Sequence, residues 1–131
     1  MKSFKIIFLS LIALSILSIS SCKKSEGQGG KASITGKIWI QRYSDLLVPL
    51  NNYPGAYEDV YIIYGNDATY GDKVKANPDG VYEFKYLRPG YYKIYAYSSG
   101  YTVSGKVAVI KQVEITEKKQ TVECETINLA K

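Results

Sequence analysis

From Ile34 to Leu129 the sequence is a succession of short segments in which apolar and polar residues alternate, and this pattern limits the fold most strongly. Alternation at every second residue is typical of strands with one buried face, whereas an amphipathic helix would need an apolar stripe at a spacing of 3.6 residues. The alternating segments are 34–41, 60–64, 73–77, 81–86, 92–97, 106–115 and 121–129. The sequence therefore predicts an all-β domain of seven strands, with almost no helix after residue 20.

Turn signals separate these segments. Asn77-Pro78-Asp79-Gly80 combines a proline that presets φ with a glycine that accepts a left-handed conformation, which is typical of a hairpin. Gly80, Gly90 and Gly100 follow one another at intervals of ten residues, which is one strand plus one turn. Such spacing favours a sandwich or a barrel. The exception is the long connection Arg42–Glu58, and connections of that length are often functional.

The strand parities also predict the core. One side of each segment is apolar, so we expect Tyr64, Tyr82, Phe84 and Tyr92 inside, with Tyr86 as a further candidate. Leu87 has the other parity, and we expect it to fill the space between the sheets together with Phe84. Cys124 alternates with charged residues, and we expect it to be a small buried residue instead of a reactive thiol.

The first 22 residues have the features of an export signal. Lys2 and Lys5 form a short basic region, and the uncharged, mostly apolar segment 6–20 is too short to span a bilayer comfortably. The ending Ile19-Ser20-Ser21-Cys22 resembles the lipobox of bacterial lipoproteins, in which the cysteine is lipidated after cleavage. The resemblance implies a signal peptide at 1–21, lipid attachment at Cys22 and anchoring to the bacterial envelope, with the outer membrane as the expected location. The alternative is an ordinary signal peptide with a chance cysteine.

Residues 22–33 are rich in Gly, Ser and Lys and lack apolar periodicity, so they are expected to form a flexible linker before a domain at 34–131. Removal of residues 1–21 would leave 110 residues, a length that fits one domain.

The charge balance bears on possible partners. Without Lys2 and Lys5, the sequence has 15 basic and 12 acidic residues, and no long basic run occurs. Nucleic acid is therefore not expected as a partner.

A family resemblance rests on Gly80-Val-Tyr-Glu-Phe-Lys-Tyr-Leu-Arg-Pro-Gly-Tyr-Tyr-Lys-Ile-Tyr-Ala, with Ile34-Thr35-Gly36 as the opening strand. This segment resembles the signature of carboxypeptidase regulatory-like domains, within the transthyretin-like (prealbumin-like) group. The resemblance implies a seven-stranded Greek-key β-sandwich and says little about activity, because such domains serve many functions.

Enzymatic functions are disfavoured by composition. The chain has no histidine, which is the commonest general base and metal ligand. Hydrolases and dioxygenases of the same architecture need histidines. Five oxygen-bearing residues between 66 and 79 could surround Ca²⁺, but they lack a calcium-loop spacing and are ordinary turn formers; they are Asn66, Asp67, Asp72, Asn77 and Asp79. We therefore expect no catalytic residues, no metal and no cofactor.

The chain has thirteen tyrosines and one tryptophan, and several of them fall on the outward parity of their strands. If these rings share one face, they form a platform that could stack on sugar rings or anchor a protein partner; the candidates are Trp39, Tyr61, Tyr91, Tyr95 and Tyr97. The alternative is that tyrosine suits exposed strand positions through its β-propensity.

The sequence thus predicts a membrane-anchored lipoprotein with a non-catalytic binding or scaffolding domain at the envelope, with a glycan or an envelope protein as partner. Two alternatives stay open: a carbohydrate-binding accessory protein that uses the exposed tyrosines, and an assembly subunit of a surface fibre polymerising through its edge strands.

Overall fold

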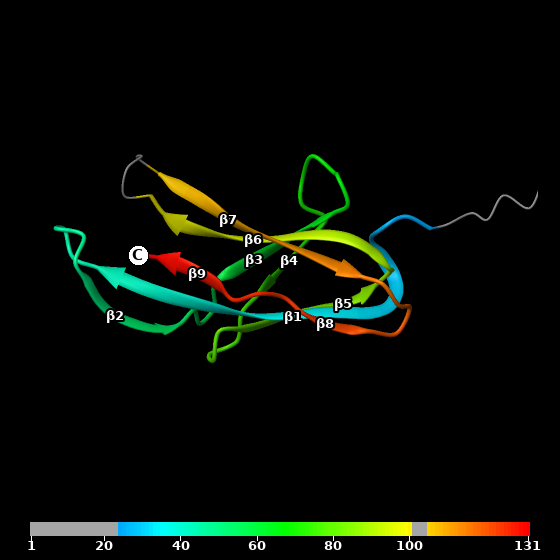
Figure 1. Cartoon of the computed structure of the whole chain (residues 1–131), viewed down its shortest axis with the longest axis horizontal. Helices are drawn as coiled ribbons and strands as arrows, with labels where there is room; N and C mark the ends of the chain where they lie inside the picture. The colour runs from blue at the N-terminus through cyan, green and yellow to red at the C-terminus, as the bar shows by residue number, and fades with distance from the viewer. Residues whose placement is uncertain (1–23, 101–104) are drawn as a thin grey trace, which may run out of the picture.

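The computed structural model describes residues 24–100 and 105–131, and this part of the chain is all-β. No helix occurs in these two segments, and so they contain no helix that could cross a membrane. The nine strands of Figure 1 are β1 (Gln28–Tyr43), β2 (Pro49–Pro54), β3 (Asp59–Tyr64), β4 (Asp72–Lys75), β5 (Val81–Leu87), β6 (Gly90–Ser99), β7 (Lys106–Ile115), β8 (Thr121–Glu123) and β9 (Ile127–Ala130).

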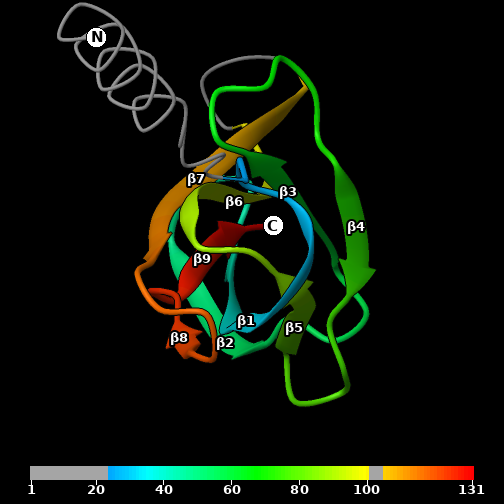
Figure 2. The same ribbon diagram turned by 90° about the vertical axis from the view of Figure 1, so that its right-hand side faces the viewer.

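Two sheets enclose one core. The long strand β1 organises a five-stranded sheet, in which it pairs antiparallel with β5 and β2 and parallel with β8 and β9. The second sheet has the order β4-β3-β6-β7 and is antiparallel throughout. Seen along the long axis, the strands surround an interior (Figure 2). Side chains from both sheets fill it. The all-β, two-sheet prediction is confirmed, and the Greek-key, transthyretin-like type stays a prediction.

The structure has nine strands where seven were predicted. One addition is β2, which lies inside the connection 42–58 and pairs with the end of β1. Prolines at both of its ends and two asparagines between them hide the alternation from the sequence. The other addition arises because the segment 121–129 divides into β8 and β9 around Cys124, whose N–H still donates to the Thr35 carbonyl at 2.8 Å.

The linker that was predicted to run to residue 33 is shorter, because β1 already begins at Gln28. The preceding residue is fixed by backbone contacts. Gly27 donates its N–H to the Tyr92 hydroxyl at 2.9 Å, and its carbonyl accepts the Arg88 N–H at 2.9 Å. Bonds to the backbone of a glycine leave no periodic pattern of side chains, so they could not be predicted from the sequence.

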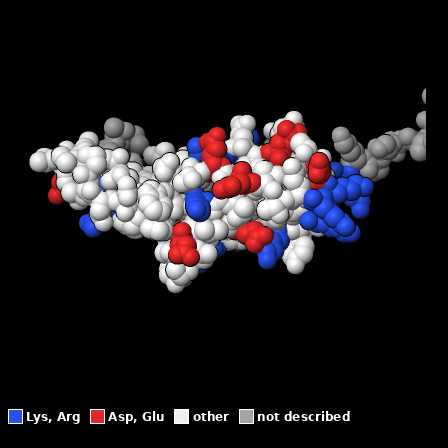
Figure 3. All heavy atoms as spheres, turned by 60° about the horizontal axis from the view of Figure 1, so that its bottom comes forward, with Lys and Arg blue, Asp and Glu red and all other residues white. Residues whose placement is uncertain are grey.

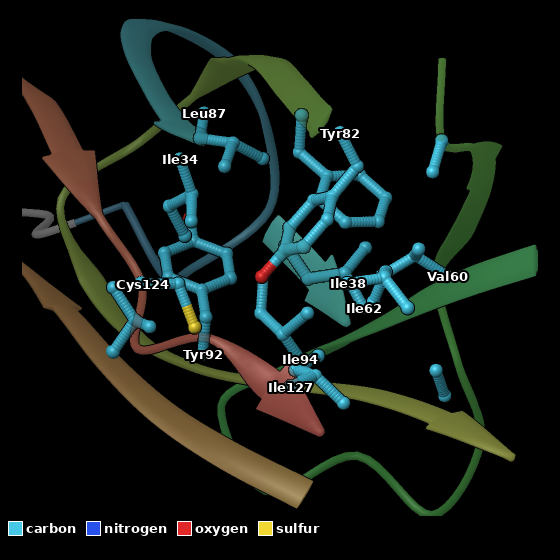
Figure 4. Close-up of a cluster of buried hydrophobic side chains, with 14 of the residues drawn as sticks. Ile34, Ile38, Val60, Ile62, Tyr82, Leu87, Tyr92, Ile94, Cys124 and Ile127 are labelled. Atoms are coloured by element: carbon cyan, nitrogen blue, oxygen red, sulfur yellow. The ribbon is translucent and has the colours of Figure 1, made fainter. Parts of the chain in front are cut away.

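The core confirms the predicted parities. Its members come from both sheets and from the segments between them (Figure 4): Ala32, Ile34, Ile38, Ile40, Val60, Ile62, Ala76, Tyr82, Phe84, Leu87, Tyr92, Ile94, Ala96, Val113, Ile115, Cys124, Ile127 and Leu129. Phe84 and Leu87 are both buried although they lie three residues apart, because Tyr86 has a φ of 60° and breaks the alternation. The expectation that Tyr86 joins the core is wrong, since this side chain is 70% exposed.

Cys124 is buried, as predicted, and burial raises the pKa of its thiol. Beside it lies the Tyr82 hydroxyl, which has no hydrogen-bond partner among the described residues. Burial and the neighbouring thiol both raise the pKa of Tyr82. A β-carbon at Gly36 would collide with this hydroxyl, so glycine at that position makes room for the ring.

The predicted turn at Asn77–Gly80 is confirmed. The Asn77 side-chain oxygen accepts the N–H groups of Asp79 and Val81 at 3.0 and 2.9 Å, and Gly80 has a φ of 75°. The turn delivers β5 directly against the N-terminal half of β1.

Candidate functional site

One row of residues crosses the outer face of the four-stranded sheet. Tyr61 on β3 lies opposite Lys73 on β4 and opposite Tyr95 on β6, which in turn lies opposite Ile110 on β7. Alternation along each strand places all four side chains away from the core. The strand register therefore gathers aromatic side chains that are 34 residues apart in the sequence.

The rings on this face contact one another. Those of Tyr61 and Tyr95 stack with their centroids 4.9 Å apart and an interplanar angle of 11°. Tyr97 meets both rings edge-on at 5.6 Å, and Tyr70 meets Tyr61 edge-on at 5.0 Å. We call these four residues the tyrosine cluster. The Lys73 ammonium lies 5.8 Å from the centroid of the Tyr61 ring, within the range of a cation–π contact.

Tyr70 was not a sequence candidate, because it lies in the connection between β3 and β4 and has no strand parity. This connection folds back on the sheet: Gly71 donates its N–H to the Ile62 carbonyl at 2.8 Å, and Asp67 donates to the Tyr64 carbonyl at 3.1 Å. The abundance of tyrosine was the one signal in the sequence that could have drawn attention to it.

Tyr95 points away from the core as predicted, but the expectation that it is exposed is wrong. It is only 9% exposed, because its neighbours cover it, whereas Tyr97 is 40% and Tyr70 is 50% exposed. Burial and the nearby Tyr97 raise the pKa of Tyr95 to about 12, so the phenol is neutral at ordinary pH. Tyr95 supports the cluster from within, and the accessible rings are its neighbours.

A hollow of about 180 Å³ adjoins the tyrosine cluster, near the end of β6. Its lining consists of Tyr57, Glu58, Asp59, Tyr61, Tyr97, Ser98, Ser99, Lys106 and Lys131. Tyr61 and Tyr97 belong to both the cluster and the hollow. Tyr57, at a φ of 60°, contributes a third ring that is 64% exposed.

Both carboxylates of the hollow have cationic partners. Asp59 accepts a hydrogen bond from the Lys75 ammonium at 2.8 Å and lies 3.9 Å from that of Lys73, and the Lys75 bond is the main reason why the pKa of Asp59 is lowered. Glu58 pairs with Lys131 at the end of the chain. The hollow therefore offers carboxylate oxygens, which accept hydrogen bonds, next to tyrosine rings.

Ser98 fixes the wall of the hollow to the opposite sheet. Its hydroxyl accepts the N–H of Ala130 at 2.8 Å and donates to the carbonyl of the same residue at 3.2 Å. Since β6 and β9 belong to different sheets, this pair of bonds holds the two layers together beside the hollow.

Two of the predicted aromatic residues lie elsewhere. Tyr91 is 63% exposed on the outer face of the four-stranded sheet, but it lies at the start of β6, six residues from Tyr97. Trp39 is 37% exposed on β1 in the other sheet, between Pro54 and Asn128. The structure thus brings together Tyr61, Tyr95 and Tyr97 only. Cys22 lies outside the described residues.

The arrangement suits ligand binding by stacking and hydrogen bonding. In segments 24–100 and 105–131, no three side chains of the His, Cys, Asp and Glu types gather where they could hold a metal ion. Two of the residues weighed as calcium ligands, Asn77 and Asp79, belong to the turn before β5.

No protein-family model matches this sequence, and no curated protein is significantly similar to it. Among solved structures, the chain is similar to a protein of Pseudomonas aeruginosa described as a "putative carbohydrate binding protein". The sequences are 16% identical, the match covers 80% of this chain and 91% of the other, and the TM-score is 0.48.

Proposed function

We propose that this protein is a lipid-anchored, non-catalytic binding module of the bacterial envelope, and that it binds a carbohydrate on the tyrosine cluster and the adjoining hollow. Cys22 would carry the lipid, in keeping with the lipobox-like ending of the leader. The resemblance to carboxypeptidase regulatory-like domains agrees with an accessory role, because such domains occur in many settings.

The single observation that carries the proposal is the meeting of three tyrosines with two carboxylates around one hollow. Tyr57, Tyr61 and Tyr97 supply ring surface, and Glu58 and Asp59 supply acceptors. A pyranose ring has an apolar face of C–H groups, which packs on an aromatic ring, and an edge of hydroxyls, which donate to carboxylates. The hollow offers both kinds of partner.

A binding assay on the chain that begins at residue 22, with Cys22→Ser, tests the proposal. We expect a hit on a glycan array, followed by a measurable dissociation constant for the best glycan. Tyr97→Ala and Tyr57→Ala should each weaken that binding by about tenfold, the loss of about 1.4 kcal/mol of contact. Tyr91→Ala and Trp39→Ala are matched controls, since these exposed rings lie away from the hollow, and they should bind as the parent does. Equal losses in all four variants would contradict the assignment of the site.

The anchor needs a separate test. Cys22 is the residue at the cleavage point that can take a thioether lipid, so Cys22→Ala in the full chain should leave the protein soluble or unprocessed. Detergent partitioning in a bacterial host measures this. Unchanged membrane association would show that something other than lipid at Cys22 anchors the protein.

A second candidate function, protein binding or assembly, is favoured by one observation. The hairpin between β1 and β2 exposes four aliphatic side chains, which are 54–86% accessible: Leu46, Leu47, Val48 and Leu50. Exposed apolar groups at a hairpin tip are typical of contacts with another protein. Size-exclusion chromatography over a range of concentrations separates the two functions, because an assembly subunit should associate without any glycan.

A further inference from the structure

Basic side chains gather at the end of the molecule from which the N-terminal segment leaves (Figure 3). Five exposed or half-buried lysine and arginine side chains lie at this end. They belong to the N-terminal segment, to β1, to the turn after β5 and to the turn between β7 and β8, and they are Lys24, Lys31, Arg88, Lys118 and Lys119. These segments are far apart in the sequence, so the fold itself brings the charges together. We call these five residues the basic end.

Hydrogen bonds hold the basic end in shape. Gln120 accepts the N–H groups of Thr116 and Glu117 on its side-chain oxygen, at 3.0 and 3.2 Å. Lys118 and Lys119 are exposed in the turn that these bonds hold. The Gln120 carbonyl accepts the N–H of Ser33 at 2.9 Å, which fastens the turn to β1.

Acidic residues at this end do not cancel the charge. Glu26 is turned toward the protein, where its side-chain oxygen accepts the N–H of Tyr91 at 3.3 Å. Glu117 is the exposed acid of the β7–β8 turn, and it adjoins two lysines. Two more acids lie nearby: Glu114 is opposite Tyr91 on β7, and Asp72 accepts a hydrogen bond from the Gln28 side chain at 3.0 Å. Five cations against these four acids still leave a positive balance, and a positive surface is attracted to anionic lipid headgroups.

The link between Cys22 and the folded domain is short. The Ser25 carbonyl accepts the Arg88 Nε–H at 2.7 Å, and Gly27 is bonded to Tyr92 and Arg88. Only two residues lie between Cys22 and Ser25, and an extended chain spans at most about 10 Å over those three steps. A lipid on Cys22 would therefore hold the basic end close to the headgroups.

We propose that the basic end docks on the anionic phospholipid surface of the membrane that carries the lipid anchor, and so fixes the orientation of the domain. This inference rests on the proposed function for the anchor alone, and not for the glycan. In that orientation the β1–β2 hairpin and the end of β6 point away from the bilayer, since they lie at the other end of the long axis (Figure 1). The hollow beside Ser98 and Ser99 would then face outward, open to a ligand.

The first test needs no lipid anchor. The described core residues lie between Ala32 and Leu129, so the chain from residue 22 with Cys22→Ser retains them all. We expect it to co-sediment with vesicles of 30% phosphatidylglycerol in phosphatidylcholine at low salt, to stay in solution with pure phosphatidylcholine vesicles, and to be released by 0.5 M NaCl. Lys118→Glu with Lys119→Glu should weaken the binding by at least about tenfold.

A matched control changes the same net charge elsewhere. Lys37→Glu with Lys93→Glu alters two lysines in the middle of the two sheets, and it should retain most of the vesicle binding. An equal loss in both double variants would mean that net charge acts without a docking surface. That result, or the absence of binding to anionic vesicles, would overturn the proposal.

The second test uses the lipidated full chain in anionic vesicles. A fluorescent label at Lys119→Cys should be quenched strongly by a headgroup-attached quencher, and a label at Asp45→Cys, on the distal hairpin, should be quenched severalfold less. Equal quenching would contradict the orientation. Failure of the anchor is distinguishable, because it would show as loss of membrane association in Cys22→Ala partitioning and would leave the vesicle assay of the unlipidated chain unchanged.

Discussion

The two faces of the four-stranded sheet both carry aromatic side chains, but these side chains are covered to different extents and by different parts of the molecule. On the inner face of β6, Tyr92, Ile94 and Ala96 are at most 1% exposed, because the five-stranded sheet covers them. On the outer face, Tyr95 is 9% and Tyr97 is 40% exposed, and their cover consists of neighbouring rings and the connection that carries Tyr70. Strand parity decides which face a side chain occupies, and burial depends on what lies over that face.

This difference separates tyrosines that are sealed in the core from tyrosines that a ligand could reach. We call the buried core the inner cluster and the tyrosine cluster the outer cluster. The inner cluster is sealed and stabilises the fold, whereas the outer cluster has a buried ring at its centre and accessible rings at its edge. The following substitutions test that distinction, in order of decreasing effect.

Phe84→Ala should have the largest effect. Phe84 is 2% exposed, and its ring centroid lies 6.0 Å from that of Tyr82. Removal of the ring would leave a cavity and should lower the free energy of unfolding by about 3–5 kcal/mol. Chemical denaturation of the chain from residue 22 measures this. A loss under 1 kcal/mol would show that the inner cluster is not sealed as described.

The inner cluster could be predicted from the sequence because both sheets alternate regularly there. Ile34, Ile38 and Ile40 share one parity on β1, and that parity is buried. The prediction failed at Tyr86, where a positive φ interrupts the alternation, and at Gln28, where β1 begins in a glycine-rich segment of irregular register. Neither feature has a side-chain pattern.

Tyr95→Ser should have an intermediate effect. The ring is almost fully covered and stacks on Tyr61, so its loss should cost about 2 kcal/mol of unfolding free energy. Tyr97→Ser is the matched control, since this more exposed ring should cost about 0.5 kcal/mol. Equal losses would mean that the outer cluster is uniform, with no supporting ring at its centre.

The outer cluster was predictable only in part. Parity placed Tyr61, Tyr95 and Tyr97 on outward faces, and the strand register, which the sequence does not reveal, brought them into contact. Tyr70 and Tyr57 come from connections between strands, where no periodicity exists to guide a prediction. The hollow depends on the connection that carries Tyr57 and on the chain end at Lys131, so it could not be derived from alternation.

The two buried tyrosines of the core allow the finest comparison, because both rings are sealed and only their hydroxyls differ. The Tyr92 hydroxyl accepts the Gly27 N–H at 2.9 Å and donates to the Arg88 carbonyl at 2.6 Å. Tyr92→Phe leaves that N–H buried without a partner, which should cost about 1–2 kcal/mol of unfolding free energy. The same variant should speed hydrogen exchange at Gly27, since this bond holds the segment before β1.

Tyr82→Phe should have the smallest effect, with no loss of stability or a small gain. The Tyr82 hydroxyl is buried without a hydrogen-bond partner among the described residues, so the folded state already bears the cost of dehydrating it. Phenylalanine keeps the ring and removes that cost, because a buried polar group without a partner is unfavourable. Parallel denaturation curves for the parent, Tyr82→Phe and Tyr92→Phe measure the difference. A loss of more than 1 kcal/mol in Tyr82→Phe would show that the hydroxyl has a partner in solution, such as a buried water beside Cys124, and that the inner cluster is less dry than its side chains suggest.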